Sequence, residues 1–398
     1  MSWSTVRADQ FCTLITDGTH DSPKPQQSGW KLITSKHLKG HYIDFDSANW
    51  ISEADYLKVI SRSAVEQWDI LFSMIGTIGN IYLEKNPHVE YACKNMGIFK
   101  FSGNKENALW MYYYLKSPQA KAYIQTHLRG STQAYVPLGG LREMPVPVPP
   151  QSVRNEIIAV LRPIDEKIEC NNAINDNLIQ QAVTIFKSWF VEYSPFDGIE
   201  PKEWETVNLE KITSLISRGI APKYSDNSDQ IVINQKCIRN HMIDLSQART
   251  HTPKVINEKW LRFGDLLINS TGDGTLGRAA QVWFQPQNIT VDSHVTVVRP
   301  AKENLIFYIG LWGVLHEREI ESLHTGSTGQ TELPKERVKA LELHLPDNGT
   351  LDRFNTLIAP MAAAIVSKQN ENNKLATLRD ALLPKLMSGE IDVSAVQL

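Results

Sequence analysis

Cysteine is scarce in this sequence. Only four cysteines occur among 398 residues, Cys12, Cys93, Cys170 and Cys237, and none forms a C-x-x-C pair or has a histidine at metal-ligand spacing. This scatter excludes a disulfide framework and gives no reason to expect a metal site. The sequence also lacks the run of about 18 apolar residues that a bilayer span needs, and its first residues contain no apolar signal-peptide core. We therefore expect a cytoplasmic protein that makes no contact with a membrane.

An excess of charge of either sign is missing as well. The chain has 41 Lys and Arg against 44 Asp and Glu, which leaves a net charge of -3. Residues 151–200 alone carry -4, so the rest of the chain is close to neutral. A generic polyanion binder would be strongly basic. Any nucleic-acid surface must therefore be a local patch of Lys and Arg, as expected where sequence reading matters more than bulk attraction.

Motifs of the common enzyme classes are also absent. The sequence has no Walker A loop, no H-E-x-x-H pair, no G-x-S-x-G elbow and no N-P-P-F/Y-like run for holding a flipped base. The stretch GDGTLG at 272–277 fits the dinucleotide fingerprint G-x-G-x-x-G, but the β-forming residues RAAQVWF follow where a helix is required. We therefore predict that this chain performs no chemistry and binds no cofactor itself.

What the sequence does contain is a copy of itself. Four pairs of segments correspond at offsets between 196 and 201 residues: WSTV with WETV, KLITSKHLKGHYIDF with IVINQKCIRNHMIDL, WDILFSMIGTIGN with GDLLINSTGDGTLGR, and GSTQAYVP with GSTGQTELP. Self-similarity at a fixed period is the signature of duplicated architecture. The pattern indicates a tandem duplication with small changes in the loops.

Each copy has the same plan. Short β-branched and aromatic runs, punctuated by Gly, Asn, Asp and Pro, predict a mixed α/β or mostly β head, and a long helical pattern follows it. The predicted fold class is α/β (α+β), with two globular heads separated by two long antiparallel helices that form a coiled-coil spacer. The predicted boundaries are 1–150 for the first head, 151–195 for the central helix, 196–348 for the second head and 349–398 for the C-terminal helix.

Apolar residues recur every three or four positions in both helical segments, which is typical of a coiled-coil seam. Asn175 and Asn372 interrupt the seam at equivalent places, and such polar residues fix the register. Pro163 and Pro360 also correspond, so we expect each helix to kink or to start afresh there. The alternative is two amphipathic helices on separate globules, and the matching seams favour packing on each other. The predicted seam residues are Ile157, Leu161, Ile164, Ile168, Asn175, Leu178, Ile185, Ile358, Met361, Ile365, Asn372, Leu375, Leu382 and Leu386.

Because the sequence contains no catalytic motif, it favours a protein that recognises and binds another molecule. Basic stretches occupy matching places in the two heads, beside Gly-rich and Gly-Ser-Thr turns that carry polar side chains. A basic stretch alone is more often a solvated face, but its recurrence beside paired turns favours DNA. Lys and Arg neutralise phosphates, while Asn, Gln, Arg, Ser and Thr reach base edges. The predicted DNA-contacting residues are Lys31, Lys36, His37, Lys39, Thr77, Asn80, Ser131, Thr132, Gln133, Lys236, Arg239, Asn240, Thr275, Arg278, Ser327, Thr328 and Gln330.

Over essentially its whole length, the sequence resembles the specificity subunit of a type I restriction-modification enzyme. The resemblance lies in the paired GSTQAYVP and GSTGQTELP turns, in the VPVPP exit into the helix RNEIIAVLRPIDEKIECNN, and in the C-terminal LRDALLPKLMSGEI. The second helix departs from the pattern, because its Pro-Pro run is reduced to Pro346.

The resemblance implies that each head is a target recognition domain for one half of a bipartite, asymmetric site in double-stranded DNA. It also implies that the helices set the spacing and dock two methyltransferase (M) subunits, with restriction/translocase (R) subunits completing the complex. S-adenosylmethionine, ATP and Mg²⁺ would be bound by those partners. Two alternatives remain open: a bivalent scaffold for protein or glycan ligands, which would bind no duplex DNA, and a methyltransferase or nuclease in its own right, which would bind S-adenosylmethionine or metal.

Overall fold

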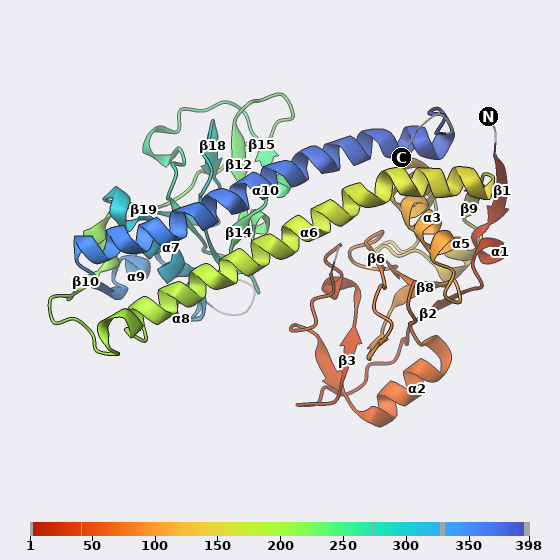
Figure 1. Ribbon diagram of the computed structural model, residues 1–398, viewed down its shortest axis with the longest axis horizontal. Coiled ribbons are helices and arrows are strands. Elements are labelled where there is room, and N and C mark those ends of the chain that lie inside the picture. Colours follow the sequence, from red (N-terminus) through yellow and green to blue (C-terminus); the bar gives the residue numbers. More distant parts are fainter. Residues whose placement is uncertain (1–2, 41, 273, 327–330, 394–398) are drawn as a thin grey trace. The chain divides into compact units, whose positions relative to one another are not determined.

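The computed structural model describes residues 3–40, 42–272, 274–326 and 331–393 (Figure 1). The chain divides into two compact units. The first unit is Met1–Glu169 together with Asn373–Leu398, and the second is Cys170–Asn372. Each unit therefore contains one mixed α+β head and a part of each of two long helices.

The first head is built from short strands and short helices. Its strands are β1 (Ser4–Arg7), β2 (Leu14–Asp17), β3 (Trp30–Ile33), β4 (Asn49–Ile51), β5 (Ile70–Ser73), β6 (Ile81–Leu83), β7 (Tyr91–Cys93), β8 (Met96–Lys100) and β9 (Pro145–Val148). Its helices are α1 (Ala8–Phe11), α2 (Glu53–Ser63), α3 (Lys105–Lys116), α4 (Pro118–Thr126) and α5 (Leu138–Arg142), and a 3-10 turn η1 covers Ser35–His37.

The second head has a similar set of elements. Its strands are β10 (Glu205–Asn208), β11 (Thr213–Arg218), β12 (Ile231–Ile233), β13 (Ile238–Arg239), β14 (Met242–Ile243), β15 (Arg249–Thr250), β16 (Leu266–Asn269), β17 (Ala279–Gln281), β18 (Ile289–Val291), β19 (Val295–Pro300) and β20 (Glu342–Leu345). Its helices are α7 (Ile306–Leu315), α8 (Glu317–Ser322) and α9 (Lys335–Lys339). The 3-10 turns are η2 (Ser194–Phe196), η3 (Leu209–Ile212), η4 (Gln235–Cys237), η5 (Leu245–Gln247), η6 (Asn257–Lys259) and η7 (Glu303–Leu305).

The two heads have the same strand topology. A four-stranded antiparallel sheet has the order β2-β8-β5-β6 in the first head and β11-β19-β16-β17 in the second. A three-stranded sheet has the order β4-β3-β7 or β15-β12-β18, and in both its central strand pairs parallel with the last. The first and last strands of each head form an antiparallel ribbon, β1 with β9 and β10 with β20. The duplication predicted from the sequence is therefore confirmed.

A buried ion pair stabilises the four-stranded sheet of each head. In the first head the Lys100 ammonium lies 2.9 Å from the carboxylate of Asp69, whose side chain is buried. In the second head Arg299 donates two hydrogen bonds of 2.7 Å to the fully buried Asp265. The arginine also donates to two backbone carbonyls, so four hydrogen bonds satisfy its guanidinium. Such satisfaction is what makes a buried charge tolerable.

The heads differ most clearly beside the three-stranded sheet. In the first head α2 begins at Glu53, after the cap residue Ser52, whose hydroxyl accepts the N–H of Asp55, and the helix packs against β7. The ring of Tyr56 in α2 also stacks on that of Trp30 in β3, with centroids 4.1 Å apart. The corresponding stretch of the second head, residues 251–260, has only the short turn η6. The three-stranded sheet is therefore accompanied by a helix in the first head and only by a short 3-10 turn in the second.

Two long helices follow the heads, α6 (Gln151–Phe190, 40 residues) and α10 (Asn348–Ser388, 41 residues). At 1.5 Å per residue each is about 60 Å long. The start of α10 is capped by Asp347, whose carboxylate accepts the backbone N–H and the hydroxyl of Thr350. In the described part of the chain, no helix combines the length and the apolar character that crossing a membrane would require.

The two helices run antiparallel within each unit. In the first unit Ile157 and Leu161 of α6 share a hydrophobic cluster with Leu383 and Leu386 of α10. In the second unit the rings of Phe186 and Phe354 lie 6.0 Å apart, in the cluster that also holds Ile358. Early residues of one helix thus meet late residues of the other, as expected for the predicted antiparallel pair.

A polar layer interrupts this packing at the predicted asparagines. In the second unit the Asn171 side-chain amide donates to Glu371 and to Asn372 at 2.9 Å, and Asn372 donates to Asn172 at 2.8 Å. Asn175 is buried next to this layer. Since a polar layer pairs only in one alignment, it disfavours a slip of one helix along the other.

The buried row of each helix differs from the predicted seam at several positions. Ile157, Leu161 and Asn175 on α6, and Ile358, Ile365 and Leu386 on α10, are buried. Ile168, Asn372 and Leu375 are half-buried. Ile164, Leu178, Ile185, Met361 and Leu382 are half-buried too, while the buried residue follows one place later, at Asp165, Ile179, Phe186, Ala362 and Leu383.

The cause of this displacement is the helical period. The predicted seam alternates steps of three and four, which corresponds to the 3.5-residue repeat of a supercoil. The buried row runs from Ile157 to Phe190, and this separation of 33 positions corresponds to about nine turns of 3.6 residues. A contact row with 3.6 residues per turn drifts relative to a heptad, so a fixed heptad selects the neighbouring residue.

One of the two outcomes expected at the prolines is also corrected. Neither helix starts afresh at Pro163 or Pro360, because α6 and α10 are each assigned as a single helix through these positions. Both prolines are exposed. A proline there removes one backbone hydrogen bond on the side that faces solvent, where water can satisfy the freed carbonyl.

Candidate nucleic-acid interface

Three loops converge in the first head and bring most of its predicted recognition residues together. They are the turn η1, the glycine loop at residues 73–80 and the GST loop at residues 129–135. The Thr77 hydroxyl, in the glycine loop, donates to the carbonyl of Ser35 in η1 at 3.2 Å. The backbone N–H of Val136, at the end of the GST loop, donates to the carbonyl of Met74 at 2.9 Å.

The second head repeats this arrangement with other side chains. Its glycine loop is 270–278 and its GST loop is 325–332. The Asn269 side-chain amide donates to the carbonyl of Gln235 in η4 at 3.1 Å. The N–H of Leu333 donates to the carbonyl of Ser270 at 2.9 Å. The same junction of three loops therefore exists in both copies, although the loops come from parts of the chain that are far apart.

The backbone explains why a Gly-Ser-Thr sequence opens the GST loop. Gly130 has a φ of +91°, and a Cβ at that position would lie 2.3 Å from the carbonyl oxygen of Gln133. Gly326 has a φ of +100° at the equivalent place. Only glycine adopts this conformation without strain, so the turn is fixed by the sequence. Ser131, Thr132 and Gln133 are exposed at its tip.

Several of the predicted residues are presented to solvent at these junctions. In the first head Lys36, Thr77 and Asn80 are exposed, together with the tip of the GST loop. In the second head Lys236 is exposed in η4, Arg239 is exposed at the end of β13, and Asn240 is exposed on the tight turn that joins β13 to β14. The predicted residues Ser327, Thr328 and Gln330 lie outside the described residues.

His37 is a correction to the sequence-based prediction. It was expected to belong to a basic surface, yet only 2% of it is exposed. Its Nδ1 accepts the backbone N–H of Thr34 at 2.9 Å, which closes the η1 turn. Burial and the neighbouring Lys36 ammonium lower the pKa of His37, so the ring is neutral at physiological pH. The equivalent residue of the second head is the buried Cys237, and both act as core anchors of the turn.

Two of the predicted lysines are already engaged inside the first head. The Lys31 ammonium donates to the carbonyl of Ala48 at 2.9 Å and lies 3.8 Å above the ring of Trp50. The Lys39 ammonium donates to the carbonyl of Lys36 at 2.6 Å. A phosphate contact by either would compete with these interactions, whereas no hydrogen bond or ion pair engages the Lys36 ammonium within the described structure.

Arg278 and Thr275 support their own loop in the second head. The Arg278 guanidinium donates to the carbonyl of Gly274 at 2.8 Å, and the Thr275 hydroxyl donates to the carbonyl of Gly272 at 3.2 Å. Both side chains are half-buried. Since a guanidinium has five N–H groups, Arg278 keeps donors for a ligand while one of them holds the loop.

Sequence reasoning missed a pair of positions at the centre of each junction. Tyr135 in the first head and Glu332 in the second head are the residues where the GST loop returns to the glycine loop. Both are exposed, and Glu332 forms an ion pair with Arg218. The aligned repeats place Tyr135 opposite Glu332, so a difference between copies was a signal that could have been found.

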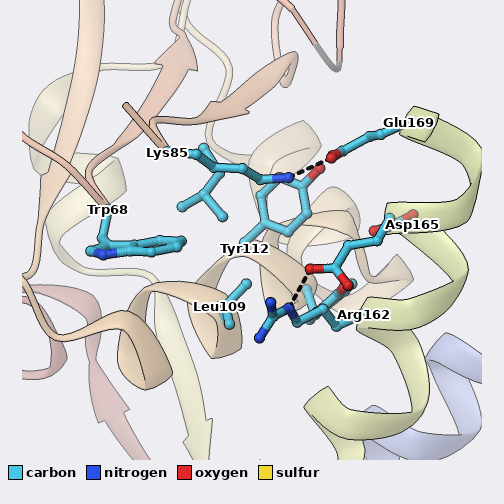
Figure 2. Close-up of a pocket in the computed structure, with 10 residues that line it drawn as sticks. Trp68, Lys85, Leu109, Tyr112, Arg162, Asp165 and Glu169 are labelled. Carbon is cyan, nitrogen blue, oxygen red and sulfur yellow. Dashed lines mark hydrogen bonds and ion pairs between the residues drawn. The ribbon is translucent and has the colours of Figure 1, made fainter. Parts of the chain in front are cut away.

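A cavity of about 110 Å³ lies between α3 and the first part of α6 in the first unit (Figure 2). Trp68, Leu109 and Tyr112 form its apolar side. Its charged side is already paired, because Lys85 lies 2.5 Å from Glu169, and Arg162 lies 2.6 Å from Glu166. Small-molecule sites measure roughly 300–1,000 Å³. This cavity therefore has room for a group no larger than a side chain.

Comparison with known proteins shows similarity along both copies. Residues 3–180 and 201–359 match the family model described as the type I restriction modification DNA specificity domain. The MjaIX specificity subunit of a type I restriction enzyme from Methanocaldococcus jannaschii is 26% identical over 390 residues, covering 91% of this chain and 86% of that protein. The HindI specificity subunit from Haemophilus influenzae is 20% identical over 416 residues, covering 86% and 90%.

A solved structure shares the fold. The crystal structure of an S subunit of a type I restriction-modification system from M. genitalium aligns with a TM-score of 0.53 and 13% sequence identity. The alignment covers 97% of this chain and 96% of the other. The aligned residues therefore include both heads and both helices.

Proposed function

The chain belongs to the family of type I restriction-modification DNA specificity domains, and from this premise we propose that it is the specificity subunit of a type I restriction-modification complex. Residues 1–150 and 196–348 would be two target recognition domains, and residues 151–195 and 349–398 would form the spacer. Each recognition domain would read one half of a bipartite, asymmetric site in double-stranded DNA.

One observation carries the proposal. Both heads have the same strand order and the same junction of three loops, but the side chains on those loops differ. Side chains on loops read base edges, while lysines and arginines position the protein on the phosphates. An asymmetric DNA site has two unlike halves. Two heads with the same backbone arrangement but different exposed side chains can each read one of these halves.

The long helices would be the docking surface for the partner subunits. The helical segment is duplicated with the head, so a chain with two copies offers two equivalent docking sites, which fits two methyltransferase subunits. Restriction/translocase subunits would join this core. S-adenosylmethionine, ATP and Mg²⁺ would be bound by those partners, and the methylation of adenine would be their chemistry. A complex of this kind acts on the DNA of its own cell, so we infer a cytoplasmic location.

The test is to express the chain with the methyltransferase encoded beside it and to map methylated adenines in the host DNA. We expect one bipartite sequence to be methylated on both strands. Exchanging residues 1–150 for the corresponding head of a related protein should change one half of that sequence and leave the other half unchanged. A complex without duplex DNA binding would instead support the protein- or glycan-binding scaffold.

A further inference from the structure

Tyr135 and Glu332 occupy the same backbone position in the two heads. Tyr135 exchanges two hydrogen bonds with Arg129, of 2.9 and 2.8 Å, which close the GST loop, and it forms a β-bridge to Ile75 of the glycine loop. Glu332 exchanges two hydrogen bonds with Thr325, of 2.8 and 2.9 Å, and forms a bridge to Thr271. The backbone of this position is thus held from both sides in each head.

The neighbouring residue shows which way the chain faces. Val136 and Leu333, one place later, are buried at 1% and 0% exposure and anchor the strand in the core. Successive residues of an extended chain point to opposite sides. Tyr135 and Glu332 are therefore directed outward, and Tyr135 is 41% exposed. A residue that only filled the core would not be exposed on this side.

The two outward side chains have opposite chemistry. Tyr135 presents an uncharged ring. Glu332 presents a carboxylate 2.5 Å from the Arg218 guanidinium, which also donates to the carbonyl of Leu333 at 3.0 Å. The first-head residue that corresponds to Arg218 is Asp17, whose carboxylate is bound to His20 and lies 3.4 Å from Arg62. A charged pair at the loop junction is therefore present in the second head, and an aromatic ring takes its place in the first.

Resting on the function proposed above, we propose that this position reads one base pair in each half-site, by apolar contact through Tyr135 and by charge through Glu332 with Arg218. In the major groove thymine exposes a methyl group, whereas a G·C pair exposes the N7 and O6 acceptors of guanine and the N4 donor of cytosine. A carboxylate accepts from cytosine N4, and a guanidinium donates to guanine.

The proposal predicts the base pairs themselves. The half-site of the first head contains an A·T pair at the point of contact, because an aromatic ring favours the thymine methyl group and offers no charged partner to a G·C pair. The half-site of the second head contains a G·C pair, because Glu332 and Arg218 together match its acceptors and its donor. Each terminal nitrogen of Arg218 keeps a second N–H for this purpose.

The experiment uses the full chain assembled with its methyltransferase, and duplexes in which each base pair of one half-site is varied in turn. Tyr135→Ala should weaken binding about tenfold to a hundredfold on the cognate first half-site and remove discrimination at one A·T pair. Tyr135→Phe keeps the ring and should behave as the unmodified chain. Glu332→Gln should remove discrimination at one G·C pair of the second half-site by a similar factor.

The half-site of the unaltered head serves as an internal control for folding and assembly. If Tyr135→Ala or Glu332→Gln weakened binding equally for all sequences, or relaxed no base pair, the assignment of this position would be wrong while the proposed function stood. If the unmodified complex itself showed no sequence-dependent binding, the proposed function would fail, and this assignment would fail with it.

Discussion

Lys36 and Lys236 occupy equivalent exposed places in η1 and η4, next to the loop junctions. A lysine there is suited to a phosphate contact, which adds affinity without sequence information. We expect Lys236→Ala to weaken binding equally for cognate and scrambled duplexes and to reduce the slope of log K against log salt by about one unit. Binding to each duplex, measured at several salt concentrations, gives both the affinities and the slope.

Lys302 provides the matched control for this experiment. It is also exposed in the second head, but it follows Pro300 at the opposite end of β19 from the loop junction. Lys302→Ala should leave the salt slope unchanged. A selective loss of the cognate site in Lys236→Ala would show that this lysine reads bases and does not hold a phosphate.

Asp265 and Arg299 allow a test of stability that is independent of DNA. The Asp265 carboxylate is fully buried, and Arg299 neutralises it. Removing one partner leaves an uncompensated buried charge, so Arg299→Met should destabilise the second head by about 3–5 kcal/mol. Faster hydrogen exchange across residues 262–300 would report this loss. The double variant Arg299→Met with Asp265→Leu should recover much of the lost stability. A double variant as unstable as Arg299→Met alone would show that the unpaired Asp265 charge is not the cause.

The elements that join the first head to its helices should respond to acid. In the first unit Asp165 of α6 binds Lys116 of α3 at 3.2 Å and Arg379 of α10 at 2.8 Å. Burial raises the pKa of Asp165, but Lys116 and Arg379 lower it by more, so the net pKa lies below that of an ordinary aspartate. The cluster thus ties three helices together through one carboxylate.

The sign of the pH effect follows from this lowered pKa. A carboxyl group whose pKa is lower in the folded state stabilises the protein fully above its unfolded pKa of about 3.9, and the stabilisation is lost as the pH falls through the folded value. Asp165→Asn should therefore lower the stability of the first unit at neutral pH and make its acid-induced unfolding less steep. The free energy of unfolding, measured by denaturation between pH 7 and pH 2, tests this prediction. An unchanged dependence of that free energy on pH in Asp165→Asn would contradict it.

The displaced buried row gives a second prediction at the level of the element. Ile179 is 4% exposed in the row, whereas its neighbour Leu178 is half-buried at the flank. Ile179→Asp should destabilise the helix pair by several kcal/mol, because a charge would be buried without a partner. Leu178→Asp should have a smaller effect, because its carboxylate can reach water. Equal effects on thermal unfolding would favour the regular heptad over the observed row.

At the scale of the whole molecule, the two continuous helices predict how the DNA spacer can be changed. Adding four residues to α6 after Glu169 and four to α10 after Asn372 lengthens each helix by about 6 Å. Since base pairs rise 3.4 Å, the recognised sequence should gain one or two base pairs between unchanged half-sites. Mapping of methylated adenines measures this directly.

An insertion in only one helix is the control for this design. It would move the polar layer of Asn171 and Asn372 out of alignment and should weaken assembly without a defined new spacer. Unchanged spacing after the paired insertion would show that the helices do not set the distance between half-sites.

The sequence by itself determined the duplication, the two long helices, the polar interruptions at Asn175 and Asn372 and the glycines of the GST loops. These features depend on spacing along the chain, on local backbone conformation and on the comparison of one copy with the other, all of which a single sequence contains. The strand order within each head and the unbroken course of α6 and α10 through their prolines did not follow from the sequence.

Tertiary structure alone decided which residues face the core and which face a ligand. His37 lies in a basic stretch, yet the η1 turn rotates it inward. Leu178 and Ile179 are equally apolar, and only the drift of a helix with 3.6 residues per turn selects Ile179. Tyr135 and Glu332 meet the glycine loops through bridges to Ile75 and Thr271. These contacts join residues about 60 positions apart, and no local pattern records such a pairing because it is set by how the sheets fold back on themselves.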